Sequence, residues 1–122
     1  MGGKKILLVD DDESLVATFK SILQSKGYSV ETAATGRQAL EKVERTKFNL
    51  VVLDIKLPDI MGDEVTRIIK KSNKDVPVVF ITGHASFQES INALELGVYD
   101  ILLKPIQAEE ILRVAKEALS VH

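Results

Sequence analysis

The chain has 122 residues, of which 45% are hydrophobic and 28% are charged, and its formal net charge at pH 7 is −2. This length suits one domain, and the hydrophobic fraction is too high for a disordered chain. The small negative charge argues against a nucleic-acid-binding surface, and the absence of cysteine excludes disulfides and thiolate metal sites. No apolar run approaches the roughly 20 residues of a membrane span. We therefore expect a single cytoplasmic domain with no membrane segment and no signal peptide.

Short strand-like runs alternate with helical patterns along the whole chain. The runs cover residues 6–9, 29–33, 50–53, 78–81 and 101–103. Such alternation is typical of an α/β fold with a parallel sheet, and nearly continuous apolar runs indicate strands that helices cover on both faces. The run 29–33 alternates polar and apolar residues instead, which indicates an edge strand.

The helical segments carry start signals and apolar faces. Thr35 with Gln38 and Ser86 with Glu89 have the spacing of capping boxes, and the fourth helix is expected to stop near Gly97. The expected apolar faces are Leu15, Phe19, Ile22 and Leu23 in the first helix, Val65, Ile68 and Ile69 in the third, and Ile111, Leu112, Ala115 and Leu119 in the fifth, over about residues 108–121.

Five such units with a polar second strand favour a doubly wound parallel sheet in the strand order 2-1-3-4-5, with five helices. In that order the chain reverses direction between strands 1 and 3, and ligands bind at such a switch point beyond the carboxyl ends of the strands. Asp10, Asp11 and Asp54 follow strands 1 and 3, so they should lie there. Thr82 and Lys104 should flank them at the ends of strands 4 and 5.

The acidic residues at this point suggest a metal site. Several carboxylates in one cleft repel each other, so some must take up a proton or bind a cation. Oxygen ligands without histidine or cysteine favour Mg²⁺ or Mn²⁺ over zinc. The alternative for an aspartate-rich loop is a helix N-terminus. We assign that alternative to Asp12 and Glu13, and expect Asp10, Asp11 and Asp54 to bind the metal.

Asp54 also has the position of a nucleophile. Pro58 and Gly62 follow it at intervals of four residues, which predicts a short, constrained loop. A carboxylate can act as a nucleophile and form an acyl phosphate. The ammonium of Lys104 has a partner in the acidic cluster and can hold a phosphoryl oxygen. The Thr82 hydroxyl can either cap its strand or donate a hydrogen bond to a phosphoryl oxygen.

These residues, in this order, resemble the receiver domain of two-component response regulators. The matching pieces are Val-Asp-Asp-Asp at 9–12, Asp54 with Pro58 and Gly62, Ile-Thr-Gly-His at 81–84, and Gly-Val-Tyr-Asp at 97–100 leading to Lys104 and Pro105. The resemblance extends from the first strand to the last helix. It implies a flavodoxin-like fold and one receiver domain over residues 1–122, with no effector domain in this chain.

The resemblance also implies a role for each site residue. Asp54 would accept a phosphoryl group from the phosphohistidine of a sensor histidine kinase or phosphotransfer protein, and Thr82 and Lys104 would bind the phosphoryl oxygens. The implied Mg²⁺ ligands, with Mn²⁺ as a substitute, are Asp11, Asp54 and the backbone carbonyl of Lys56, with Asp10 acting through a metal-bound water. Such a chain catalyses only its own phosphorylation and slow dephosphorylation, so we do not expect an enzyme.

The resemblance has one departure, which concerns the switch. Many receiver domains carry an aromatic residue three positions before the lysine, where this chain has Ile101, and Tyr99 lies outside that position. Either a rotamer change of Ile101 or a movement of the fourth helix alone could replace the aromatic switch. The implied output surface comprises the fourth helix, the last strand and the last helix, and could also form a homodimer. Lys56 and His84 would flank the hydrolytic water, although a solvated loop residue is the plainer interpretation of His84.

Three other functions fit the sequence less well. A phosphatase with an aspartyl nucleophile generally needs a second aspartate two residues later, where this chain has Lys56. A receiver-like module that is not phosphorylated normally lacks one of the key acidic or lysine positions, and none is lost here. A dinucleotide site would need a glycine-rich loop after the first strand, where the acidic cluster stands. We also expect no direct DNA binding, because the chain has no basic stripe and no helix-turn-helix signature.

Overall fold

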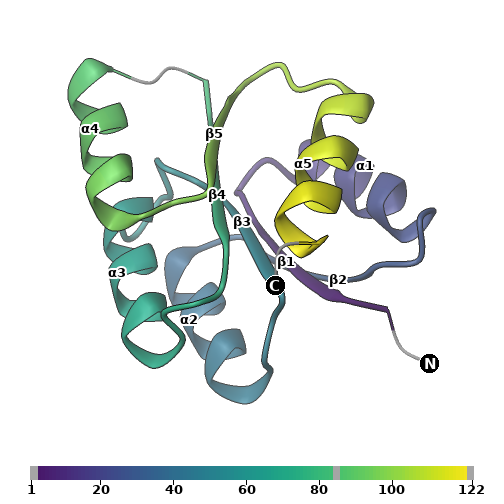
Figure 1. The fold of residues 1–122 in the computed structure, drawn as a ribbon, viewed down its shortest axis with the longest axis horizontal. Coiled ribbons are helices and arrows are strands. Elements are labelled where there is room, and N and C mark those ends of the chain that lie inside the picture. Colours follow the sequence, from purple (N-terminus) through teal and green to yellow (C-terminus); the bar gives the residue numbers. More distant parts are fainter. Residues whose placement is uncertain (1–2, 84–85, 121–122) are drawn as a thin grey trace.

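The computed structural model describes residues 3–83 and 86–120. Over these residues the strands are β1 (Lys5–Val9), β2 (Ser29–Ala33), β3 (Leu50–Asp54), β4 (Val78–Thr82) and β5 (Asp100–Leu103). The helices are α1 (Glu13–Gln24), α2 (Gly36–Arg45), α3 (Gly62–Ser72), α4 (Phe87–Leu96) and α5 (Ala108–Ser120). All strand pairs are parallel, in the order β2-β1-β3-β4-β5 (Figure 1). The predicted fold class and strand order are confirmed.

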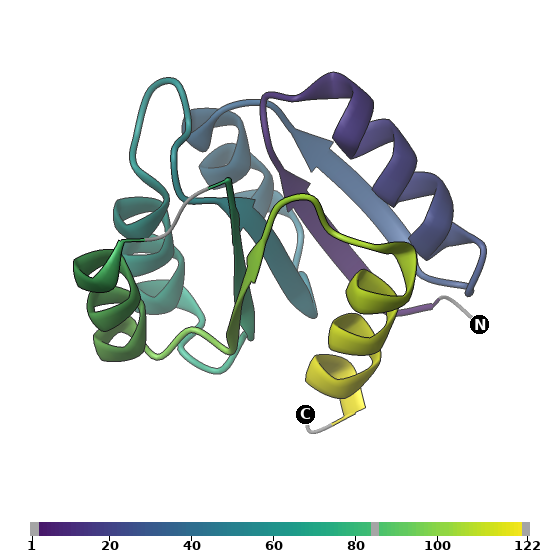
Figure 2. The same ribbon diagram turned by 90° about the horizontal axis from the view of Figure 1, so that it is seen from above.

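The sheet separates two apolar cores. Helices α1 and α5 cover one face of the sheet, and α2, α3 and α4 cover the other, as Figures 1 and 2 show. Along β1, Ile6 and Leu8 pack in the first core, whereas Leu7 and Val9 pack in the second. Because both faces are covered, alternate residues are equally buried, and this explains why the strand is a continuous apolar run.

The strands extend slightly beyond the apolar runs in the sequence. β3 includes Asp54 and β4 includes Thr82, so each of these strands ends one residue later than predicted. β1 starts at Lys5 and β5 at Asp100, one residue earlier than predicted. β2 has the predicted bounds and lies at an edge of the sheet, as its alternating pattern indicated.

The helix faces follow the predicted pattern except in α3. Val65 and Ile69 are buried there, but Ile68 is 37% exposed and Thr66 is fully buried in its place. The Thr66 hydroxyl donates a hydrogen bond to the carbonyl of Gly62 at 2.8 Å, which allows a polar side chain to be buried. The prediction for Ile68 was therefore wrong.

The helix starts are also close to the predictions. Ser86 and Glu89 form a complete capping box, and α4 ends before Gly97 in the left-handed conformation, at φ 75°. Thr35 caps α2 by accepting a hydrogen bond from the Gln38 amide. The Gln38 side chain does not complete the box, because it accepts from the backbone N–H one residue before Thr35.

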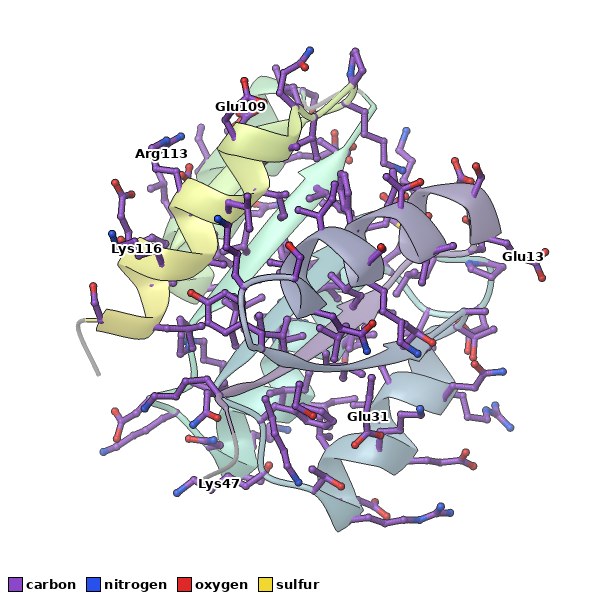
Figure 3. The ribbon with its side chains drawn as sticks, turned by 90° about the vertical axis from the view of Figure 1, so that its right-hand side faces the viewer. Glu13, Glu31, Lys47, Glu109, Arg113 and Lys116 are labelled. Carbon is purple, nitrogen blue, oxygen red and sulfur yellow. The ribbon has the colours of Figure 1, made fainter. Side chains whose placement is uncertain are left out.

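The exposed side of α5 is polar. Glu109, Arg113 and Lys116 point away from the sheet in Figure 3, and all three are exposed. The predicted C-terminal residue of this helix, Val121, lies outside the described residues. Among the helices of residues 3–83 and 86–120, none is long and apolar enough to cross a membrane.

The loop that follows β3 is closed at its base. The Gly62 amide donates a hydrogen bond to the Ile55 carbonyl at 2.6 Å, and Lys56 and Met61 form an antiparallel bridge. A Cβ atom at Gly62 would lie 2.6 Å from the Asp54 carbonyl oxygen and 2.8 Å from the Ile55 Cα. Glycine is therefore required here for close approach of two backbone segments. The predicted short, constrained loop is confirmed.

We predict that Gly62→Ala destabilises the fold by about 1–3 kcal/mol, because the added methyl group must displace backbone atoms. The measurement is urea unfolding followed by circular dichroism. Gly83→Ala is the matched control, since a Cβ atom there has nothing within 4 Å, and its effect should stay within about 0.5 kcal/mol. Equal unfolding midpoints for the two variants would contradict this account of Gly62.

Candidate functional site

The candidate site lies at the carboxyl end of the sheet, where the loops after β1, β3, β4 and β5 begin. Val9 pairs with Leu53, so the next residues along β1 and β3, Asp10 and Asp54, are neighbours. Thr82 ends β4, next to β3, and the Lys104 amide donates to the Thr82 carbonyl at 2.8 Å. The strand order therefore brings together residues that are far apart in the sequence, as the switch-point rule predicts.

The three predicted metal-binding carboxylates form one cluster. Asp10, Asp11 and Asp54 each offer a carboxylate oxygen, and these oxygens all lie within 4.8 Å of one another. Asp10 and Asp54 are buried, whereas Asp11 is exposed. The Asp12 amide donates to Asp10 Oδ1 at 2.9 Å. The three carboxylates are thus close enough to share one cation.

Lys104 joins two of these carboxylates. Its Nζ lies 2.9 Å from Asp10 Oδ2 and 3.0 Å from Asp54 Oδ2. The contact with Asp54 is also a hydrogen bond, and the second oxygen of Asp54 accepts from the Lys56 amide at 3.0 Å. Asp10 Oδ2 is buried, and its partner among the described residues is the same ammonium of Lys104. One ammonium thus serves two buried carboxylates.

The electrostatics of the cluster follow from this arrangement. Loss of water around the buried carboxyl raises the pKa of Asp10, although the Asp12 amide and Lys104 act in the opposite direction. Partial burial disfavours the charged form of Lys104, but its contacts with Asp10 and Asp54 outweigh burial and raise its pKa. Three carboxylates face one ammonium, so the cluster carries excess negative charge when ionised. An all-oxygen donor set of three carboxylates, paired with one ammonium, fits a hard divalent cation such as Mg²⁺.

The remaining predicted residues have clear positions. Lys56 lies two residues after the end of β3 and is exposed, and Thr82 is buried at the end of β4. The metal-binding role of the Lys56 carbonyl and the phosphoryl-binding role of Thr82 stay predictions. The roles of Asp12 and Glu13 are those of a helix N-terminus: Asp12 is the N-cap of α1, and Glu13 lies in its first turn. His84 lies outside the described residues.

One carboxylate near the site was not singled out from the sequence. Asp59, in the loop after β3, accepts hydrogen bonds from the backbone amides of Gly36 and Arg37 at 2.8 and 2.9 Å. These amides belong to the first turn of α2 and lie 23 and 22 positions away in the sequence. No local motif signals a contact over that separation.

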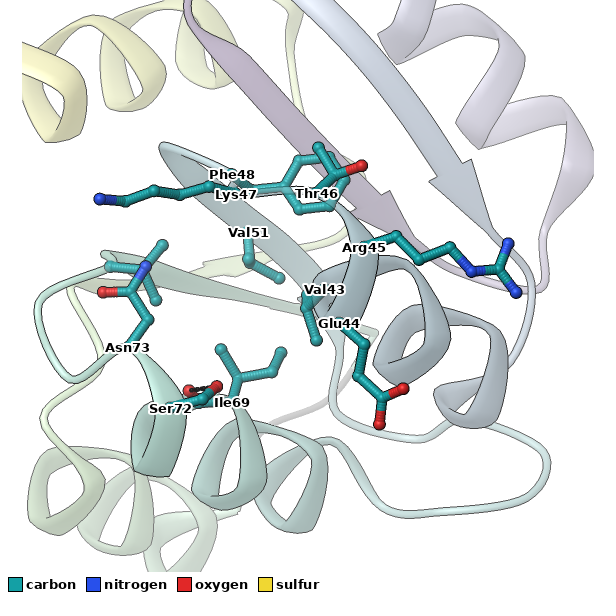
Figure 4. A pocket seen from close by; sticks show the side chains of 11 residues that line it. Val43, Glu44, Arg45, Thr46, Lys47, Phe48, Val51, Ile69, Ser72 and Asn73 are labelled. Atoms are coloured by element: carbon teal, nitrogen blue, oxygen red, sulfur yellow. Dashed lines mark hydrogen bonds between the residues drawn. The ribbon is translucent and has the colours of Figure 1, made fainter.

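A cavity of about 390 Å³ lies elsewhere, between the ends of α2 and α3 (Figure 4). Lys47, Phe48 and Asn73 are among the residues that line it. These residues precede β3 and β4, so the cavity is at the amino end of the sheet, opposite the acidic cluster. It contributes no group to the candidate site.

Comparison with known proteins agrees with this geometry. The sequence model of the response regulator receiver domain matches residues 6–116. The luminescence regulatory protein LuxO of Vibrio campbellii is 34% identical over 112 residues, which is 92% of this chain and 25% of LuxO. The transcriptional regulatory protein ZraR of Klebsiella oxytoca is 37% identical over 115 residues, or 94% of this chain and 26% of ZraR. The chain thus spans about a quarter of the length of these curated relatives.

Solved structures show the same likeness in three dimensions. A CheY-like receiver domain protein from Methanospirillum hungatei has a TM-score of 0.95 at 38% identity, with 98% of this chain and 96% of that chain covered. The non-phosphorylated HemR receiver domain from Leptospira biflexa has a TM-score of 0.92, with the same identity and coverage. The resemblance seen in the sequence is confirmed: the chain belongs to the response regulator receiver domain family.

Proposed function

We propose that this chain is a phosphorylation switch in which Asp54 accepts a phosphoryl group from a phosphohistidine in a Mg²⁺-dependent reaction. The observation that carries the proposal is the position of Lys104 Nζ, 2.9 Å from Asp10 and 3.0 Å from Asp54 within a cluster of three carboxylates. The donor would be a sensor histidine kinase or a phosphotransfer protein. We propose that the domain acts in the cytoplasm together with this donor. Membership of the receiver family supports this assignment.

Asp54 is the proposed nucleophile. An electron pair of one carboxylate oxygen forms the new O–P bond while the N–P bond to the donor histidine breaks. The histidine nitrogen keeps the electron pair of the broken bond and takes up a proton, which yields a neutral imidazole and an acyl phosphate. Such a transfer depends mainly on in-line positioning and charge neutralisation. The Lys56 amide and Lys104 supply positioning, because each holds one oxygen of Asp54.

The proposed metal ligands are Asp11, Asp54 and the Lys56 carbonyl, with Asp10 acting through a metal-bound water. When bound, Mg²⁺ or Mn²⁺ supplies positive charge between the anionic nucleophile and the anionic phosphoryl group. Thr82 and Lys104 would then bind the phosphoryl oxygens. The same site would hydrolyse the acyl phosphate slowly, so the chain would not turn over an external substrate.

The proposed output surface comprises α4, β5 and α5. Leu94, Tyr99 and Leu103 are exposed on it, with exposed fractions of 76%, 39% and 57%. Ile101, at the usual aromatic switch position, is only partly buried and packs against the core under α4. A partner, an effector domain elsewhere or a second copy of this chain would bind this surface. We propose that the switch operates through Ile101 or through a shift of α4.

Asp54→Asn should abolish phosphorylation, because a carboxamide is a poor nucleophile at this position. The measurement is an intact mass spectrum after incubation with acetyl phosphate and Mg²⁺, repeated with a phosphorylated histidine kinase. The wild-type chain should gain one phosphoryl group only when the metal is present. Equal labelling of the variant would overturn the assignment of Asp54, and wild-type labelling without metal would overturn the Mg²⁺ dependence.

Lys104→Met should strengthen Mg²⁺ binding about five- to tenfold, since the ammonium and the cation compete for the same carboxylates; tenfold corresponds to about 1.4 kcal/mol. Isothermal titration calorimetry measures the dissociation constant. The control is Lys116→Met, which removes an equal charge from an exposed side chain of α5 outside the candidate site. If both variants change the affinity equally, Lys104 acts only through the overall charge and not through its contacts with Asp10 and Asp54.

A further inference from the structure

The loop of residues 55–62 is fastened at two places. At its base, the Gly62 amide donates to the Ile55 carbonyl, and Lys56 forms a bridge with Met61. At its tip, both oxygens of Asp59 accept hydrogen bonds from the amides that open α2. The proposed metal ligand Lys56 belongs to the attachment at the base and precedes Asp59, at the tip, by three residues.

The attachment at the tip provides hydrogen-bond acceptors for backbone amides in the first turn of α2. The first N–H groups of a helix have no partner within the helix. Here the Gly36 and Arg37 amides donate to Asp59, and the Gln38 amide donates to the Thr35 hydroxyl. The Asp59 carboxylate is therefore a helix cap supplied by a different part of the chain.

The packing at Gly36 shows how closely the two segments approach. A Cβ atom there would lie 2.9 Å from the Val65 side chain, 3.1 Å from Ile60 and 3.4 Å from Asp59 Oδ1. Only a residue without a side chain leaves the loop this close to α2. The hydrogen bonds from Arg37 and Gly36, the former contributing most, lower the pKa of Asp59, so its carboxylate stays charged at the positive end of the helix dipole.

The segment between Lys56 and Asp59 can transmit this restraint. Leu57 is 7% exposed and packs in the core between the sheet and α2, α3 and α4. Pro58 has a fixed φ angle, which removes one degree of freedom from the chain. Leu57 and Pro58 therefore leave the chain little conformational freedom between Lys56 and Asp59.

We propose that Asp59 is a positioning residue for the metal site: by fastening the loop after β3 to the first turn of α2, it holds the Lys56 carbonyl in place for the cation. This inference rests on the proposed function, because it assumes that the cluster binds Mg²⁺. The coupling between Mg²⁺ binding and the contact of Asp59 with α2 must also act in both directions. If the contact of Asp59 with α2 favours metal binding, metal binding must favour that contact by the same free energy.

The first test compares Mg²⁺ affinities by isothermal titration calorimetry. Asp59→Ala should weaken binding about fivefold, less than the roughly 10- to 100-fold effect of losing a group bonded directly to a ligand. Asp59→Asn should weaken Mg²⁺ binding less than Asp59→Ala does, because the carboxamide keeps one acceptor oxygen. Asp59→Glu keeps the carboxylate, so its Mg²⁺ affinity should lie between those of Asp59→Ala and the wild-type chain. Asp63→Asn is the matched control, since it removes the same charge from a carboxylate that accepts from Glu64 in its own helix.

The second test uses the wild-type chain and does not depend on a variant that folds. Hydrogen exchange measured by NMR should show that Mg²⁺ slows exchange of the Gly36 and Arg37 amides by about the same fivefold factor. The Ser90 amide, which donates to Ser86 in the first turn of α4, serves as an internal reference.

The outcomes separate this inference from the proposed function. If wild-type protein binds Mg²⁺ and labels at Asp54, but Asp59→Ala matches Asp63→Asn in affinity and exchange at Gly36 is unchanged, Asp59 is only a helix cap and the inference is wrong. If the wild-type chain neither binds Mg²⁺ nor labels, the proposed function and the inference fail together. A loss of stability in Asp59→Ala without a loss of affinity would likewise overturn the positioning role.

Discussion

The structure of the site depends on two buried carboxylates that share one ammonium. Burying a charge is costly unless it is paired, and here Lys104 is the cation that pairs with both Asp10 and Asp54. A third carboxylate, Asp11, stands at the same point. The arrangement tolerates this excess of negative charge only because the cluster opens to solvent at the end of the sheet, where a hard cation and its waters can reach it.

The fold supplies this arrangement through register and strand order. β1 and β3 are neighbours only because the chain reverses direction between them, and their register sets Asp10 beside Asp54. Two apolar cores hold these strands rigidly, since every residue from Ile6 to Val9 is buried on one face or the other. The carboxylates of the candidate site therefore extend from strands held on both faces, as chemistry that relies on positioning would require.

The strand order and the proximity of Asp10, Asp11, Asp54 and Lys104 could be predicted from the sequence. Both depend on a local pattern, in which an apolar run is followed at once by a polar residue. Prediction from the sequence failed where the outcome depends on packing between distant segments. Ile68 is exposed because Thr66, whose hydroxyl bonds within its own helix, occupies the buried position instead. The contact of Asp59 with α2 could not be predicted for the same reason, since its partners lie 22 and 23 residues away.

β5 connects the candidate site to the proposed output surface, because Lys104 directly follows this strand and Leu103 is exposed at its end. Thr82 pairs with Leu103 across β4 and β5, and the Lys104 amide donates to the Thr82 carbonyl, so the two residues proposed to bind phosphoryl oxygens are joined through the backbone. Leu103 is 57% exposed on the outer side of the same strand. A movement of Lys104 from Asp10 toward a phosphoryl group would pull directly on the end of β5. In this chain, with Ile101 in the usual aromatic position, that backbone connection would link the proposed phosphorylation of Asp54 to the proposed output surface.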